Sequence, residues 1–200
     1  MVDCIRDEII PFVESKYHTI PFRSYLGHSY AASYGNYLFQ YEPSLFSGYL
    51  LMGAERIGPQ SPAFELTPAM KNWVQKRHTF YYLGVGKSDM ERRLNYGKEI
   101  ADKVKAPDST HFAFRFDTIE GGDHTNIITL SLQRAINHLY QFYTPYQEVG
   151  PTDHAGKVFE VVLDEVVRIY HMSPLKTPTY YNRFLPLAIE HNDTTSLKAY

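Results

Sequence analysis

An apolar run bounded by glycines, residues 46–53 (FSGYLLMG), constrains the fold of this chain more than any other feature. A continuous apolar run of this length is typical of a strand that is buried on both faces, as in a parallel sheet covered by helices. Two further strands are predicted at 79–85 (TFYYLGV) and 112–119 (FAFRFDTI), and a short one at 22–26 that Gly27 ends. Any fold for this chain must therefore place a mostly buried sheet at its centre.

Amphipathic helices are predicted before, between and after these strands, at 3–15, 29–40, 67–75, 89–104 and 125–143. Pro11 is expected to kink or end the first of them, whereas Thr67 and Pro68 suit the cap and first position of the third. Helices and strands thus alternate along the chain. This order predicts an α/β fold with a mostly parallel sheet flanked by helices and joined by right-handed crossovers.

The last part of the chain has a different pattern. We predict a linker at 145–153, helices at 157–170 and 180–190, and the start of another at 194. The sequence therefore predicts two parts, an α/β domain at 1–144 and a helical extension at 145–200.

Charge and composition exclude several classes of function. Lys and Arg total 20 against 22 Asp and Glu, a formal net charge of −2 that favours neither nucleic acid nor an anionic membrane as a partner. No apolar run approaches the ~20 residues of a membrane-spanning helix. The first ten residues, MVDCIRDEII, also lack the pattern of a signal peptide. We therefore expect a soluble protein, cytoplasmic by default.

Metal and cofactor sites are not predicted either. The single cysteine, Cys4, excludes an intrachain disulfide and a thiolate metal cluster. The nine histidines show no paired ligand spacing. Gly84 and Gly86 form a Gly-x-Gly pair without the rest of a dinucleotide-binding motif. We expect no metal and no cofactor.

A serine stands where the strand predicted at 22–26 turns into the next helix. Ser29 lies in YLGHSYAA, with Gly27 two residues before it and Ala31 two residues after. This resembles the nucleophile elbow, Gly-x-Ser-x-Gly, in which both flanking positions must be small because the turn is tight. The Tyr30 N–H, at the start of the helix, is the predicted oxyanion donor. The alternative is an ordinary turn with an N-capping serine.

Two further side chains complete a predicted Ser–acid–His order. His124 follows the last strand in the loop EGGDHTN, where this arrangement places its histidine. Asp89 follows the strand predicted at 79–85 and would hold the imidazole in the required tautomer. Glu91 is the alternative for this acid. The alternatives are that the acids merely start a helix and that His124 is a solvated residue beside a helix cap.

The combination of these stretches resembles the esterase family of α/β-hydrolases that includes enterochelin esterases, esterase D and mycolyltransferases. The resemblance extends over about residues 3–143 and includes FRSYLGHSYAASYGNYLFQYEPSLFSGYLLMG, FYYLGVG and FDTIEGGDHTN. It implies that Ser29 is the nucleophile and His124 the base, whereas the acid is less well marked. The tail resembles the helical extension of some relatives, in which tetratricopeptide-like helices begin.

The chain departs from this family in one respect, because only 28 residues precede Ser29. The family's fold has several strands before the elbow, so the chain resembles the C-terminal half of an esterase. The strand at 22–26 is then expected to expose an edge that pairs with a second copy or a partner chain. We expect a serine hydrolase acting on small-molecule carboxylic esters through an acyl-enzyme. The alternatives are an acyltransferase and a catalytically silent remnant that acts as an interaction module.

Overall fold

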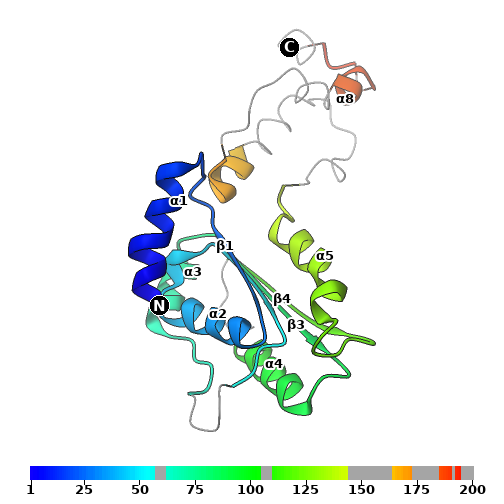
Figure 1. The fold of residues 1–200 in the computed structure, drawn as a ribbon. Helices are drawn as coiled ribbons and strands as arrows, with labels where there is room; N and C mark the ends of the chain where they lie inside the picture. Colours follow the sequence, from blue (N-terminus) through cyan, green and yellow to red (C-terminus); the bar gives the residue numbers. More distant parts are fainter. Residues whose placement is uncertain (57–61, 105–109, 144–163, 173–184, 191, 195–200) are drawn as a thin grey trace. The chain divides into compact units, whose positions relative to one another are not determined.

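The computed structural model describes residues 1–56, 62–104, 110–143, 164–172, 185–190 and 192–194 (Figure 1). The chain divides into two compact units, Met1–Leu139 and Tyr140–Tyr200. None of the described helices is long and apolar enough to cross a membrane.

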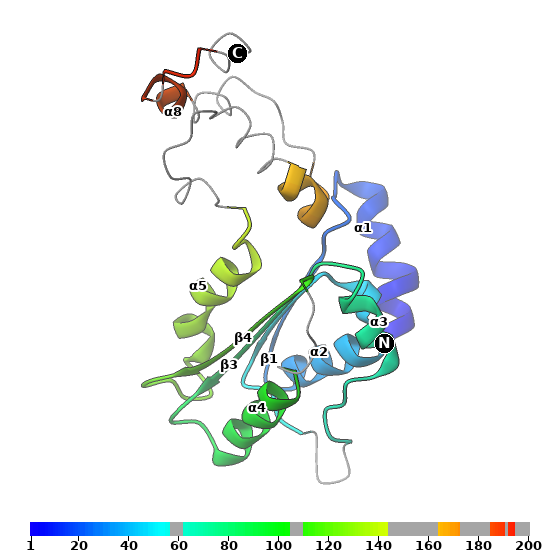
Figure 2. The ribbon, with the colours of Figure 1, turned by 180° about the vertical axis from the view of Figure 1, so that it is seen from behind.

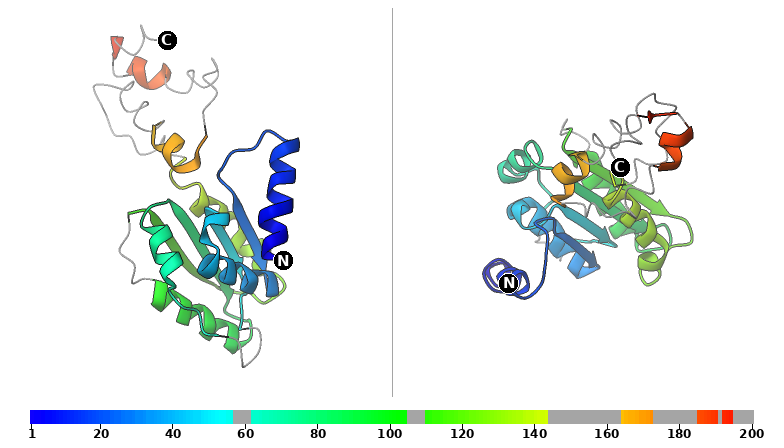
Figure 3. Two further views of the ribbon diagram at one scale, coloured as in Figure 1. Left: turned by 90° about the vertical axis from the view of Figure 1, so that its left-hand side faces the viewer. Right: turned by 90° about the horizontal axis from the view of Figure 1, so that it is seen from above.

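Four parallel strands form the centre of the first unit. They are β1 (Ser24–His28), β2 (Gly48–Met52), β3 (Thr79–Gly86) and β4 (Phe112–Ile119). They pair in the order β1-β2-β3-β4, and Figure 3 shows them side by side. The predicted α/β fold with a parallel sheet is confirmed.

The first strand differs from its prediction. It runs from Ser24 to His28, two residues later than 22–26, so Gly27 lies inside it rather than at its end. Gly27 and His28 stay in register with Leu51 and Met52 of β2. The sheet thus keeps the strand extended up to the residue before Ser29, against the tendency of a glycine to interrupt it.

Helices cover both faces of this sheet. They are α1 (Ile10–Lys16), α2 (Tyr30–Tyr41), α3 (Pro68–Val74), α4 (Glu91–Val104) and α5 (Ile127–Leu139), with a π-helix, η1 (Cys4–Ile9), before α1 and a short 3-10 helix, η2 (Pro43–Leu45), after α2. Helices α2 and α4 lie against one face and α5 against the other (Figure 1 and Figure 2). Tyr81 of β3 donates its hydroxyl to Asn36 of α2, whereas the neighbouring Tyr82 lies near His138 of α5, as side-chain alternation along a strand requires.

The strands are buried as their composition predicts. All five residues of β2 and all eight of β3 are buried. The largest fully buried side chains are mostly aromatic and include Tyr49, Tyr81, Tyr82, Phe39 and Phe80. Burial raises the pKa of Tyr81 well above its ordinary value, so this phenol stays neutral.

Two helix ends show how local chemistry sets the boundaries. Thr67 caps α3 as predicted, because its hydroxyl accepts a hydrogen bond from the Met70 N–H at 3.2 Å. Pro11 does not end the first helix. The helix continues through it, and the chain changes from a π-helix to an α-helix at Ile10, the residue before the proline.

The described part of the second unit is helical at 164–170 and in α8 (Leu185–Glu190), inside the two helices predicted there. The Tyr170 ring packs against Tyr140 and Tyr143, with centroids 5.7 and 6.2 Å away. The predicted linker at 145–153, the remainder of both helices and all but Thr194 of the last predicted helix lie outside the described residues.

Candidate active site

Ser29 occupies a strained turn between β1 and α2. Its backbone has φ 59° and ψ −123°, a combination that non-glycine residues rarely adopt and that costs about 1–3 kcal/mol. A Cβ added at Gly27 would lie 2.7 Å from the carbonyl carbon of Ala31, so the turn requires a residue without a side chain there. The local backbone therefore has the tight geometry that the Gly-x-Ser-x-Ala pattern predicts.

The structure brings Ser29, His124 and Asp89 together. The Ser29 Oγ lies 3.0 Å from the His124 Nε2, and the His124 Nδ1 lies 3.2 Å from the Asp89 Oδ2. Ser29, Asp89 and His124 follow β1, β3 and β4, whose carboxyl ends meet at one edge of the parallel sheet. If the Nδ1 carries the proton, it donates to the carboxylate, and the Nε2 lone pair is free to accept from the serine hydroxyl.

The Asp89 carboxylate is almost fully enclosed, with 1% of its side chain exposed. Burial alone raises its pKa, but hydrogen bonds from Arg93, the Met90 N–H and His124 outweigh that effect, and the pKa lies below the ordinary value. Asp89 is therefore ionised at neutral pH. Glu91, the alternative acid, is exposed in the first turn of α4.

Tyr30 is the first residue of α2, so its N–H is among the four at a helix start that have no acceptor within the helix. Its side chain is 63% exposed. The position suits an oxyanion donor, and that role stays a prediction.

His28 is a site residue that the sequence analysis missed. Its Nε2 lies 2.7 Å from the backbone oxygen of His124, and because a carbonyl oxygen can only accept, this nitrogen carries a proton and donates. The two imidazole rings lie 4.6 Å apart. The one available signal was its position between Gly27 and Ser29, which requires no particular residue type in the motif.

Glycines let the surrounding loops approach one another closely. Gly53, after β2, has φ +63°, and a Cβ added there would lie 3.2 Å from the His124 Nδ1. A Cβ at Gly86, at the end of β3, would lie 2.3 Å from the backbone oxygen of Gly122 in the loop that carries the histidine. The two loops are joined further by the Ser88 N–H, which donates to the Gly122 oxygen at 2.8 Å. These contacts fix the histidine loop over the sheet edge.

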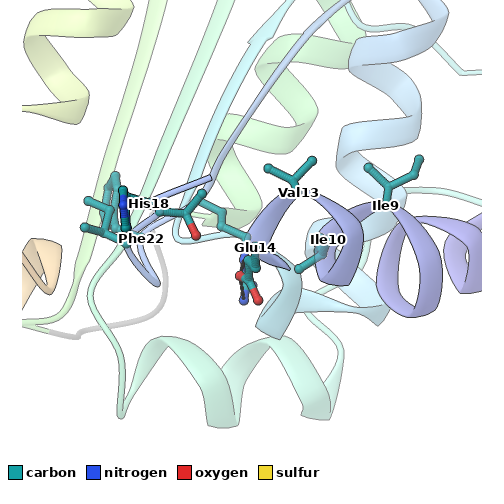
Figure 4. A pocket seen from close by; sticks show the side chains of 9 residues that line it. Ile9, Ile10, Val13, Glu14, His18 and Phe22 are labelled. Atoms are coloured by element: carbon teal, nitrogen blue, oxygen red, sulfur yellow. Dashed lines mark hydrogen bonds and ion pairs between the residues drawn. The ribbon is translucent and has the colours of Figure 1, made fainter. Parts of the chain in front are cut away.

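A separate apolar groove lies near the amino end of β1, whereas Ser29 follows the carboxyl end of that strand. Figure 4 shows side chains of α1 and of the segment leading to β1 around it. Its volume is about 430 Å³, and Ile9, Ile10, Val13 and Phe22 give it an apolar lining. The groove is therefore not part of the candidate active site.

Comparison with known proteins supports the fold. No protein-family model matches the chain, and no curated protein sequence matches it. Solved structures do match. An IroE-like serine hydrolase from Shewanella oneidensis has a TM-score of 0.66 at 14% identity, and the match covers 98% of this chain and 62% of that one. The siderophore hydrolase EstA from Aspergillus nidulans has a TM-score of 0.55 at 16% identity, covering 70% of this chain and 55% of the other.

A third match is an uncharacterised protein from Capnocytophaga ochracea, with a TM-score of 0.70 at 15% identity, covering 96% of this chain and 55% of the other. The chain thus spans 55% to 62% of the length of these three proteins. Identities this low establish the architecture alone. The chain therefore shares with these solved structures the architecture of a parallel sheet flanked by helices, over the part that the matches cover.

Proposed function

We propose that this chain is a serine hydrolase that cleaves carboxylic esters through an acyl-enzyme on Ser29. The observation that carries the proposal is the hydrogen-bonded series from the Ser29 Oγ to the His124 Nε2 and from the His124 Nδ1 to Asp89, at 3.0 and 3.2 Å. A serine is a weak nucleophile unless an adjacent base takes its proton, and this series supplies that base. The backbone strain at Ser29 adds support, because strain of this kind clusters at functional sites.

The proposed reaction has two halves. The Ser29 Oγ attacks the ester carbonyl carbon while its proton moves to the His124 Nε2. The tetrahedral intermediate then collapses, the carbon–oxygen bond to the alcohol breaks, and the leaving alkoxide takes the proton from His124. Water repeats these steps on the acyl-enzyme and releases the acid and free Ser29. Asp89 stays ionised throughout and stabilises the imidazolium.

The negative oxygen of the tetrahedral intermediate needs a donor. The Tyr30 N–H is our candidate, since it lies next to the nucleophile at the start of α2. The partial positive charge of the helix N-terminus acts in the same direction.

A fluorophosphonate probe tests the proposal directly, because it modifies serines that an adjacent base activates. We expect labelling of the folded protein, with the modified peptide mapping to Ser29. Ser29→Ala should remove the label, whereas Ser24→Ala, at an exposed serine of β1, should retain labelling at Ser29. A folded protein that is not labelled, or is labelled elsewhere, would contradict the assignment.

The same acyl-enzyme would support acyl transfer if an alcohol replaced water as the acceptor. Product analysis with an added alcohol separates the two activities. Hydrolysis predicts free acid as the main product at all alcohol concentrations, and an acyltransferase predicts a new ester as the main product.

An interaction function is the second candidate, and the position of β1 favours it. Among the described strands β1 pairs with β2 alone, and Leu26 on this edge strand is 49% exposed. An open edge next to exposed apolar side chains is a template for pairing with another strand. We infer that β1 pairs with a strand of a second polypeptide chain.

Light scattering coupled to size-exclusion chromatography tests the pairing. We expect the protein to elute as an assembly larger than a monomer, and Leu26→Lys to shift it to the monomer because a lysine beside the edge opposes pairing. Phe12→Lys, at a 60% exposed residue of α1, is the matched control and should leave the assembly intact. A monomeric unmodified protein would exclude pairing between two copies of this chain.

A further inference from the structure

A second buried carboxylate lies behind the candidate active site. Glu55 follows β2 and is 5% exposed. Its Oε1 accepts from the Arg93 Nη2 at 2.9 Å and its Oε2 from the Arg92 Nε at 2.8 Å. Burial alone raises the pKa of Glu55, but the two arginines outweigh that effect, and the pKa lies below its ordinary value. This carboxylate is therefore ionised as well.

Arg93 joins this carboxylate to the candidate catalytic acid. Its Nη1 donates to the Asp89 Oδ1 at 2.8 Å while its Nη2 donates to Glu55, and 7% of the arginine side chain is exposed. A planar guanidinium holds its donors in a fixed fork, so the position of one carboxylate constrains that of the other. Asp89 uses its second oxygen, Oδ2, for His124.

Ser33 connects Glu55 to the nucleophile, Ser29, through backbone hydrogen bonds. The Glu55 N–H donates to the Ser33 Oγ at 3.0 Å, and that hydroxyl donates to the Glu55 backbone oxygen at 2.6 Å. The Ser33 N–H in turn donates to the Ser29 backbone oxygen at 3.0 Å. The contacts thus form a closed ring of Ser29, His124, Asp89, Arg93, Glu55 and Ser33.

We propose that Arg93 and Glu55 are positioning residues for the ester hydrolysis, acting on His124 through Asp89. Arg93 holds the carboxylate of Asp89 in the orientation that the imidazole needs. Glu55 offsets the charge of Arg93. The inference rests on the proposed function, because it assigns these residues a part in the same reaction.

The charge balance explains why a second carboxylate is needed. Asp89 and Arg93 alone form a neutral pair, which offers a developing imidazolium little net stabilisation. With Glu55 the three side chains carry a net charge of −1, so the group that faces His124 stays negative. Arg92 also contacts Glu55, but its side chain is 63% exposed, and solvent screens its charge. His28, a further titratable group against His124, has its ring tilted against the imidazole, with the centroids 4.6 Å apart, and its Nε2 bonds to the His124 backbone oxygen.

A histidine imidazole NMR titration of the full chain tests this charge effect without requiring turnover, with His124→Gln identifying the His124 resonance. In Glu55→Gln the amide oxygen still accepts from Arg93, but the negative charge is lost. We expect the His124 titration midpoint to fall, because the network that faces the imidazole loses a negative charge. In Arg93→Gln the cation is lost instead, and the midpoint should rise. Opposite signs are not expected from structural damage alone.

Glu99→Gln is the matched control. Glu99 is a carboxylate of α4 that pairs with Arg56 and Lys103, outside the ring. Its replacement should leave the His124 midpoint unchanged. Circular dichroism establishes that each variant is folded, and either Glu55→Gln or Arg93→Gln suffices for the test because each has its own predicted sign.

The outcomes separate this inference from the proposed function. A midpoint that stays unchanged in folded Glu55→Gln or Arg93→Gln, or moves against the predicted sign, overturns the role of the pair. The His124 midpoint could also move as predicted in both variants while the protein shows no esterase activity that depends on Ser29. That result would overturn the proposed function, whereas the charge effect on His124 would stand. Midpoint shifts of the predicted sign, together with a matching shift of the acidic limb of the pH profile of kcat/KM, support both the proposed function and the role of the pair.

Discussion

Ser29→Ala is expected to lower kcat/KM for p-nitrophenyl acetate by about 10⁴- to 10⁶-fold, because it removes the only atom that forms the covalent intermediate in the proposed reaction. The fold should persist, since the alanine keeps the Cβ and the helix start. Initial rates of p-nitrophenolate release, with circular dichroism for folding, provide the measurement. Ser24→Ala, at an exposed serine of β1, is the control and should be as active as the unmodified protein.

The strained backbone adds a second signature at the same position. Ser29→Gly should be equally inactive but more stable than Ser29→Ala by about 1 kcal/mol, since glycine adopts φ 59° without the steric cost. Denaturant unfolding of the two variants measures this difference. Ester hydrolysis that survives both replacements would show that Ser29 is not the nucleophile.

Asp89→Asn is expected to lower kcat by about 10³- to 10⁴-fold. An amide at this position no longer selects the imidazole tautomer with a protonated Nδ1, and it brings no negative charge to stabilise the imidazolium. The distance between the His124 Nδ1 and the Asp89 Oδ2, 3.2 Å, makes this the acid that the imidazole contacts. Steady-state kinetics at the plateau of the pH profile give kcat and KM separately, and the loss should fall on kcat.

Glu91→Gln is the control for this replacement, because Glu91 is the other carboxylate at the start of α4 and is exposed. We expect its kcat to stay within about twofold of the unmodified value, as for most surface changes. If Glu91→Gln lowered kcat as much as Asp89→Asn does, the assignment of Asp89 as the acid would be wrong. Arg93 loses a charged partner in Asp89→Asn, so the folded state of that variant needs an independent check.

The layered fold was predictable because strands buried on both faces appear in the sequence as continuous apolar runs. The strands predicted from the apolar stretches 46–53 and 79–85, β2 and β3, are buried along their whole length. The bounds of β1 were not predictable in the same way. A glycine such as Gly27 is typical of a strand end, but pairing with β2 keeps this residue extended. Such pairing depends on residues more than twenty positions away in the sequence.

The candidate site shows the same limit. That Ser29, Asp89 and His124 lie close together was predictable, because each follows a strand and the carboxyl ends of parallel strands meet at one edge. The choice of Asp89 over Glu91 needed the loop contacts that set the start of α4. Glu55 was missed because its ion pair with Arg93 joins residues 38 positions apart.

The pairing of Asp89 with Arg93 had a local signal, since the two residues stand four apart at the start of a predicted helix. Several sequence-based hypotheses stay predictions: the catalytic roles of Ser29, Asp89 and His124, the oxyanion role of Tyr30, the boundary between domains at 144 and 145, and the pairing of the sheet edge.

The contact between Gly86 and Gly122 has a consequence for engineering this chain. A methyl group at Gly86 would occupy space that the Gly122 backbone already fills, and a backbone cannot rotate away as a side chain can. Libraries built to change substrate range should therefore leave both glycines untouched. Diversity is better placed at Tyr30, which is 63% exposed and lies next to the nucleophile.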